Sequence, residues 1–258
     1  MHGIFDTHAH YDDERFDEDR ETLLQNLPSQ GVVGVLSCGV NQETSLYNIA
    51  LSEQYSYLYA AVGFHGLNAD EAPDSEAELQ AILEPMVQHE KVRAIGEIGL
   101  DYYYEKETRE KQLFLFEAQL KLAKAWDLPV SVHDREAHED TLRLLKQYKP
   151  KGVVHCFSGS VEMAKEVLKL GMYIGLGGAV TFKNAKKPVE VAAMVPADRL
   201  LLETDAPYMT PVPYRGKRCD SAHIAYTAER LAQIRGTTPE AIVDSTQQNA
   251  KRLFLNED

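Results

Sequence analysis

A repeated alternation of short apolar runs with amphipathic stretches is the feature that most constrains the fold of this chain. Eight apolar runs rich in β-branched residues alternate with segments whose apolar residues recur at helical spacing. The runs cover Gly3–Asp6, Val32–Ser37, Leu58–Gly63, Val92–Gly96, Pro129–Val132, Gly152–Val154, Met172–Gly175 and Leu200–Glu203. Runs of this kind, with little polar alternation, are typical of strands buried on both faces of a sheet.

Three of the intervening segments show apolar residues three and four positions apart, as an amphipathic helix requires. They are Leu113, Phe116, Leu120 and Ala123; Ala164, Val167 and Leu168; and Ala228, Leu231 and Ile234. Strand–helix alternation implies parallel strands joined by right-handed crossovers. Eight such units in 258 residues predict an α/β fold, a (β/α)8 TIM barrel that forms a single domain over residues 1–258, with a doubly wound open sheet as the alternative.

Composition narrows the class of protein. No run reaches the roughly 18 apolar residues of a membrane span, so we expect no membrane association. The first residues lack the pattern of a secretory signal peptide. Three scattered cysteines, Cys38, Cys156 and Cys219, cannot build a disulfide framework. We therefore expect a cytoplasmic protein.

Residues that bind metals or transfer protons cluster where the predicted strands end, which is where the active sites of TIM barrels lie. Five of the nine histidines and two carboxylates follow the apolar runs: His8, His10, His65, Glu97, His133, His155 and Asp205. His8 and His10 are two positions apart, so an extended backbone directs both imidazoles to the same side. Imidazoles and carboxylates gathered in a cleft need a cation to offset their repulsion and desolvation, and this predicts a metal site.

The number of ligands indicates two metal ions. His8, His10, His133 and His155 together with two carboxylates exceed the three protein ligands that one catalytic ion needs. Six ligands suit two ions roughly 3.5–4 Å apart with a shared carboxylate. We expect Glu97 to be the shared ligand, because its strand lies midway between the two pairs of histidines. The nitrogen and oxygen ligands suit Zn, Mn, Co or Fe better than Mg, and the sequence leaves all five open.

Several segments, taken together and in order, resemble the TatD family of metal-dependent hydrolases. They are Phe5–His10, Gly96–Tyr103, His155–Gly159, Leu202–Tyr208, Pro213–Arg218 and Thr246–Phe254. The resemblance implies a TIM barrel with a binuclear metal centre and deoxyribonuclease or phosphodiesterase activity. It also implies the ligand sets: His8, His10, Glu97 and Asp205 for one ion, and Glu97, His133 and His155 for the other.

Two departures from the family pattern lie in loops that we expect on the substrate side. Gly66 follows His65 where the family usually has proline, and Cys219-Asp220 stands where an asparagine is typical. These differences put the substrate range in question more than the metal site.

The expected activity is hydrolysis of an ester bond, most simply the phosphodiester of DNA, by an exonuclease-like enzyme that prefers single-stranded ends. Glu97 serves as the shared ligand, and Asp205 is the candidate general base, with a purely ligating role as the alternative. His65 is needed by neither ion, so we assign it to orienting a phosphate oxygen; a role in the core is the alternative. The same centre would also suit cleavage of an amide, a lactone or an aminoacyl ester such as D-aminoacyl-tRNA.

The chain has 27 basic and 40 acidic residues, so a phosphate-bearing substrate must be held locally rather than by overall charge. Arg215 is the expected phosphate clamp because guanidinium binds phosphate through two hydrogen bonds. Tyr103 is expected to stack on an unpaired base. Arg135, two residues beyond His133, completes the predicted substrate-binding set. We expect a monomer or a weak homo-oligomer.

Overall fold

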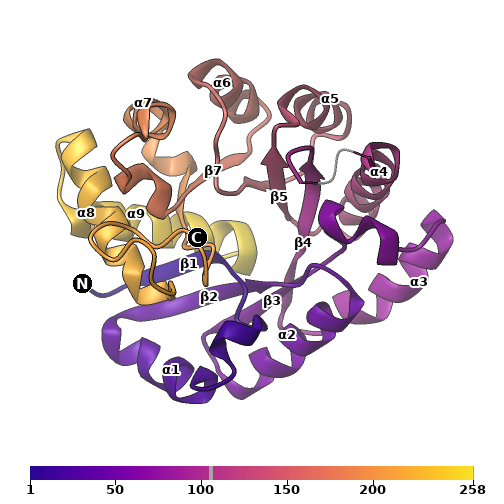
Figure 1. Cartoon of the computed structure of the whole chain (residues 1–258), viewed down its shortest axis with the longest axis horizontal. Helices are drawn as coiled ribbons and strands as arrows, with labels where there is room; N and C mark the ends of the chain where they lie inside the picture. The colour runs from indigo at the N-terminus through magenta and orange to yellow at the C-terminus, as the bar shows by residue number, and fades with distance from the viewer. Residues whose placement is uncertain (105–106, 258) are drawn as a thin grey trace.

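Eight parallel strands, each paired with the next one along the chain, form the wall of a barrel with the helices outside it (Figure 1). The computed structural model describes residues 1–104 and 107–257. The strands are β1 (Ile4–Ala9), β2 (Val32–Cys38), β3 (Leu58–Val62), β4 (Val92–Asp101), β5 (Val130–Arg135), β6 (Gly152–Val154), β7 (Tyr173–Leu176) and β8 (Leu200–Leu202). This is the TIM-barrel fold predicted from the alternation of apolar runs, and it excludes the open doubly wound sheet.

The helices surround the strands (Figure 1). They are α1 (Arg20–Asn26), α2 (Gln42–Gln54), α3 (Glu76–Val87), α4 (Arg109–Ala125), α5 (His138–Tyr148), α6 (Val161–Lys169), α7 (Lys186–Met194), α8 (Ile224–Arg235) and α9 (Pro239–Ala250). The three predicted helical patterns fall within α4, α6 and α8, so these predictions are confirmed. No helix in the described parts of the chain is long and apolar enough to cross a membrane.

Three strands extend well beyond the apolar runs that predicted them. β1 continues past Asp6 to Ala9, β4 from Gly96 to Asp101, and β5 from Val132 to Arg135. The run of apolar side chains stops where the polar site begins, but backbone pairing goes on, with Gly99 opposite His133. His8 and Glu97 therefore lie within strands, which are held more rigidly than loops.

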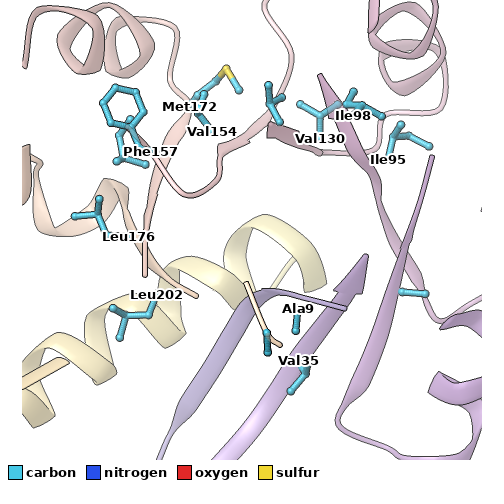
Figure 2. Packing of buried hydrophobic residues seen from close by; sticks show 14 of the residues in the cluster. Ala9, Val35, Ile95, Ile98, Val130, Val154, Phe157, Met172, Leu176 and Leu202 are labelled. Carbon is cyan, nitrogen blue, oxygen red and sulfur yellow. The ribbon is translucent and has the colours of Figure 1, made fainter. Parts of the chain in front are cut away.

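Buried side chains pack in two layers. The outer layer fills the space between the strands and the helices, and Figure 2 shows part of it, including Val35, Ile95 and Leu202. The second cluster brings together residues from seven strands and the end of the chain, among them Phe5, Leu36, Ala61, Ala94, Val153, Tyr173, Leu201 and Phe254. Val153 and Leu201 lie two positions before His155 and Glu203, so they share a strand face with them, and this cluster forms the apolar floor beneath the polar site.

The seam between β8 and β1 differs from the other strand pairs. It holds an isolated bridge between Ala9 and Ala206 instead of a continuous ladder. The Asp205 N–H donates to the His8 carbonyl at 2.9 Å, and the His10 N–H donates to the Ala206 carbonyl at 2.7 Å. Below them, the hydroxyl of Thr204 donates to the buried carboxylate of Asp6 at 2.6 Å. We name this contact between the first and last strands the β1–β8 seam.

Candidate metal centre

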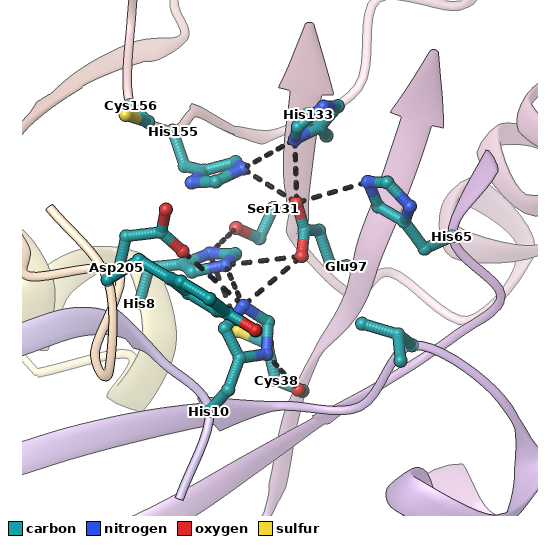
Figure 3. A network of polar contacts seen from close by, with 12 residues as sticks. His8, His10, Cys38, His65, Glu97, Ser131, His133, His155, Cys156 and Asp205 are labelled. Atoms are coloured by element: carbon teal, nitrogen blue, oxygen red, sulfur yellow. Dashed lines mark hydrogen bonds and ion pairs between the residues drawn. The ribbon is translucent and has the colours of Figure 1, made fainter. Parts of the chain in front are cut away.

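The polar cluster predicted from the strand ends is present at the carboxyl ends of the strands. Imidazoles and carboxylates from β1, β4, β5 and the segments that follow β3, β6 and β8 point toward one another (Figure 3). Three groups have potential ligand atoms within 4.8 Å of one another: His8, His155 and Asp205; His8, His10 and Glu97; His65, Glu97 and His133. All seven residues that the sequence analysis singled out for metal binding or catalysis are therefore brought together.

Glu97 lies at the centre of this cluster, and its two oxygens face different histidines. Its Oε2 is 3.5 Å from His8 Nε2 and 3.3 Å from His10 Nε2. Its Oε1 is 2.8 Å from both His133 Nδ1 and His155 Nε2. The carboxylate thus spans two pairs of imidazoles, with one oxygen directed at each pair.

The outer ring nitrogens of His10 and His133 are held by hydrogen bonds. His10 Nδ1 lies 2.9 Å from the carbonyl oxygen of Cys38, and His133 Nε2 lies 3.0 Å from Asp101 Oδ2. Both partners are acceptors, so each outer nitrogen carries the hydrogen. The inner nitrogen of each neutral ring then presents a lone pair to the cluster, which is how a metal-ligating histidine is prepared.

His8 is fully buried, and its ring stacks on His155 with 3.7 Å between ring centroids. Its Nδ1 is 2.9 Å from the hydroxyl of Ser131. Burial and the neighbouring charge of His155 lower the pKa of His8 to about 3, so this imidazole is neutral. Its Nε2 is directed at Glu97 and His10.

In His65 the hydrogen lies on the inner nitrogen, unlike in His10 and His133. Its Nδ1 accepts a hydrogen bond from the Leu67 N–H at 3.0 Å, which places the hydrogen of the neutral ring on Nε2. That nitrogen lies 3.3 Å from Glu97 Oε1. Burial lowers the pKa of His65, so the ring stays neutral and presents an N–H donor to the cluster. A donor at this position suits an oxygen of a ligand better than a metal ion.

The cluster attracts positive charge. Burial by itself lowers the pKa of His155, but the carboxylates of Glu97 and Glu203 more than offset this and raise it to about 10. Burial also opposes protonation of His10, whose pKa is nevertheless raised well above its usual value by Asp205 and Glu97. Although burial raises the pKa of Glu97, the surrounding histidines hold it well below its usual range.

The arrangement therefore fits divalent cations. Carboxylate oxygens and inner imidazole nitrogens converge, while the outer nitrogens of His10 and His133 are already committed to acceptors. Without a metal, this cluster takes up protons instead. Bound cations would replace those protons and satisfy the same atoms, and the mixed donor set is one that first-row transition metals favour.

A cavity of about 600 Å³ opens above the cluster. Its floor includes His10, His65, Glu97, His133 and Asp205, and its walls include Asp12, Asp13, Val40, Leu67, Asn68, Asp101, Tyr104, Arg135, Tyr208 and Met209. Among the wall residues, Leu67, Tyr104 and Tyr208 are 40%, 59% and 41% exposed. Exposed apolar and aromatic residues thus stand among charged ones around a polar floor.

The predicted substrate-binding residues are distributed unevenly around this cavity. Arg135 lines it, and its guanidinium carbon lies 4.2 Å from the centroid of Tyr103 and 4.6 Å from that of Tyr104. Tyr104, rather than Tyr103, is part of the wall. Arg215 lies outside the lining, exposed, with its guanidinium carbon 4.2 Å from the centroid of Phe182.

Three residues that support the histidines were not singled out by sequence reasoning: Ser131, Asp101 and Glu203. Asp101 and Glu203 lie within the segments that resemble the TatD family, beside Glu97 and Asp205. Nothing in the spacing distinguishes a carboxylate that faces the cluster from one behind an imidazole, so only the structure separates them.

Close packing around the loop after β3 explains why residue 66, which follows His65, is a glycine. A Cβ on Gly66 would lie 2.6 Å from Gln112 Oε1 and 2.8 Å from the Gly99 carbonyl oxygen. The departure from the usual family residue thus coincides with a close approach of two other segments.

An eight-stranded parallel barrel whose carboxyl mouth gathers imidazoles and carboxylates able to hold a metal ion fits one class of protein, the metal-dependent hydrolases of the TIM-barrel type. The family model described as TatD related DNase matches residues 5–255. The chain belongs to the TatD family.

The sequences of individual relatives match this chain over almost its whole length. The chain is 41% identical over 254 residues to YabD of Bacillus subtilis, described as an uncharacterised metal-dependent hydrolase, with 97% of this chain and 98% of the relative covered. It is 33% identical over 260 residues to the protein of Erwinia tasmaniensis named 3′-5′ ssDNA/RNA exonuclease TatD, with 97% and 99% covered. The crystal structure of YjjV, a TatD homologue from Escherichia coli, superposes with a TM-score of 0.91 at 36% identity, covering 99% of this chain and 98% of that one.

Proposed function

We propose that this protein is a phosphodiesterase that removes nucleotides from an end of single-stranded DNA, using two divalent metal ions. The observation that carries the proposal is the position of Glu97, whose two oxygens each face a separate pair of histidines at the floor of an open cavity. The printed name of the Erwinia relative, a single-stranded DNA and RNA exonuclease, supports the choice of substrate.

The ligands of the two ions follow from the two sides of Glu97. His8, His10, Glu97 and Asp205 would hold one ion, and Glu97, His133 and His155 would hold the other. When bound, such ions supply Lewis-acid activation of the phosphoryl group and of the attacking water. The identity of the metal is among Zn, Mn, Co, Fe and Mg.

Asp205 is the proposed general base. Its side chain is 20% exposed against 6% for Glu97, so it is the more accessible of the two to water entering from the cavity. Burial raises its pKa, but His10 and His155 more than offset this and lower it, which keeps the carboxylate ionised. An ionised carboxylate at the cavity floor is able to accept the proton of the attacking water.

His65 is proposed to hold a phosphate oxygen. Its Nδ1 accepts from the Leu67 N–H, so its Nε2–H is a donor directed at the cluster. A fixed donor near the charge that develops on the phosphoryl group stabilises the transition state, and loss of one such donor costs about 10²–10³ in kcat.

The rim is proposed to hold the nucleotide next to the scissile bond. Arg135 supplies a positive charge to a wall that also contains Asp12 and Asp13. Tyr104 offers an exposed aromatic ring in the wall, and Tyr103 stands next to it. Aromatic stacking on an unpaired base contributes about 1–3 kcal/mol, which favours single strands over paired ones. Arg215, being outside the cavity, would contact only the strand that continues beyond it.

The test is hydrolysis of single-stranded oligonucleotides by metal-stripped protein. Substrates labelled at the 5′ or the 3′ end are incubated with Mg, Mn, Co or Zn added singly. We expect a ladder that shortens from one end, appears only with metal and is lost in Glu97→Ala. Glu190→Ala, an exposed change on α7, is the control for a lost carboxylate.

A second set of substrates tests whether the same centre cleaves a bond other than a phosphodiester. If the protein binds metal but leaves every phosphodiester intact while it cleaves an amide, a lactone or an aminoacyl ester, the nuclease proposal is wrong. His65→Asn sharpens the result, since we expect it to lower kcat while the metal content is unchanged.

A further inference from the structure

A pair of buried polar atoms behind His155 lacks hydrogen-bond partners. In residues 1–104 and 107–257, three buried side-chain polar atoms have none: Arg93 Nε, His155 Nδ1 and Glu203 Oε2. The last two belong to neighbouring side chains, because His155 Nδ1 lies 3.8 Å from Glu203 Oε1. That separation is too long for a hydrogen bond.

Glu203 is held in this place from several sides. It is fully buried, and its Oε1 accepts a hydrogen bond from the Cys156 N–H. A Cβ on Gly175 would lie 2.3 Å from Glu203 Oε2 and 3.1 Å from the His155 Cα. The absence of a side chain at position 175 therefore makes room for a carboxylate next to this imidazole. A buried carboxylate with a free oxygen is costly unless some state of the protein uses it.

The outer nitrogens of His10 and His133 show what that use is. His133 Nε2 meets a carboxylate at 3.0 Å, and His10 Nδ1 meets a backbone carbonyl at 2.9 Å. A histidine that ligates metal through one nitrogen carries its hydrogen on the other, and this hydrogen needs an acceptor. His155 directs Nε2 at Glu97, so its hydrogen would be on Nδ1, on the side of Glu203.

We propose that Glu203 is the positioning residue of His155: when this imidazole ligates a metal ion, its Nδ1–H closes a hydrogen bond to the Glu203 carboxylate, whose Oε2 is otherwise without a partner. The carboxylate then fixes the tautomer and the ring orientation of His155, and it raises the affinity of the metal site that His155 shares with His133 and Glu97. The inference rests on the metal centre of the proposed function and does not depend on which bond the enzyme cleaves.

The first test is calorimetric titration of the metal-stripped full-length protein with Zn²⁺. Glu203→Gln keeps the size of the side chain and an acceptor for Cys156, and it removes the charge. We expect one of the two sites to weaken by about 10- to 100-fold and the other to keep its affinity. Glu190→Gln, exposed on α7, controls for the loss of one negative charge, and thermal unfolding checks that each variant is folded.

The second test needs no variant. Long-range ¹H–¹⁵N correlation spectra of the Zn²⁺-loaded protein assign the hydrogen of each imidazole. We expect His155 to carry it on Nδ1, with a downfield proton that exchanges slowly with solvent. In Glu203→Gln this proton should shift upfield and exchange faster, while that of His10 should not change.

The outcomes separate the inference from the proposed function. Two sites of unchanged affinity in Glu203→Gln, or a metal-loaded His155 without a hydrogen on Nδ1, would overturn the inference and leave the metal centre in place. A wild-type protein that takes up no Zn²⁺ would overturn both. A wild-type protein without nuclease activity, whose Glu203→Gln variant still shows the expected change in Zn²⁺ affinity, would overturn only the choice of substrate.

Discussion

The two sides of the cluster differ in where their carboxylates lie relative to the imidazole rings. On the side of β1 and β8, a second carboxylate joins Glu97 among the inner atoms, with Asp205 Oδ1 3.5 Å from His10 Nε2. Behind this histidine stands a neutral acceptor, the carbonyl of Cys38.

The side of β5 and β6 has the reverse arrangement. Glu97 is the carboxylate that faces the inner nitrogens, and the other negative charges lie behind the rings. Asp101 stands behind His133 at 3.0 Å, and Glu203 stands behind His155 at 3.8 Å.

The comparison indicates how the two proposed metal positions could be made different with similar side chains. A carboxylate in direct contact attracts a cation by its full charge, whereas one behind an imidazole acts by making the ring a better donor. We therefore expect the two positions to differ in affinity and in their response to mutation. Four predictions test this difference.

The largest effect is expected from removing the residue common to both sides. Glu97→Ala should lose both ions and lower the hydrolytic rate by about 10³-fold or more, since the several kcal/mol that the metals contribute would be lost. Metal content by mass spectrometry and the rate of hydrolysis measure this. A variant that keeps both ions would show that the two sides do not share Glu97.

Single ligands on each side come next. His10→Ala and His133→Ala should each reduce the bound metal from two ions to one. The affinity lost should exceed the roughly 10- to 100-fold effect of removing an outer partner. Titration of each variant with Zn²⁺ decides the point, and loss of both ions in either variant would mean that the two positions fill together.

The residues behind the rings should distinguish the sides more finely. Asp101→Asn removes a charge and should weaken metal binding by about 10- to 100-fold. Ser131→Ala removes only the neutral hydroxyl behind His8, a net loss of about 0.5–1.5 kcal/mol, and should weaken it only several-fold. Equal effects would contradict the distinction between charged and neutral support.

The smallest effect concerns pH and the stability of the metal-free protein. The pKa of His155 is raised to about 10 in the folded state, compared with about 6.5 in an unfolded chain. Its contribution to stability is fully present below about pH 6.5 and is lost as the pH rises toward 10. We expect the Tm of the metal-free protein to fall over this range.

Calorimetry of the wild type beside His155→Gln isolates this contribution together with the effect of His155 on its neighbours in the cluster, because groups away from the cluster titrate in both proteins alike. A difference in Tm that stays constant from neutral to alkaline pH would show that His155 is not protonated in the metal-free state. Zn²⁺ binding should show the opposite trend and strengthen with pH, since the ion displaces the proton.

Much of the fold could be predicted because burial on both faces leaves a clear apolar run for every strand. The lengths of β1 and β4 could not, since strand pairing continues under polar side chains where the run has ended. The cluster of His8, His10, Glu97, His133 and Asp205 was anticipated by the same logic, because barrel geometry directs strand ends to one place.

The surroundings of the cluster were harder to anticipate. Whether a carboxylate faces the cavity or an imidazole depends on local backbone angles, such as the φ of +62° at Asp205 and +42° at Cys156. Such conformations are uncommon in residues other than glycine, and composition does not reveal them. The position of Arg215, stacked on Phe182 outside the cavity, follows from loop packing in the same way.

The β1–β8 seam determines when the candidate site can assemble during synthesis of the chain. His8 and His10 are synthesised some two hundred positions before Thr204 and Asp205. The contacts from Asp205 to the His8 carbonyl and from Thr204 to Asp6 form only when the barrel closes. A nascent chain therefore carries most of the proposed ligands before the contacts that assemble them can form, and the candidate site is complete only after the last strand has joined the first.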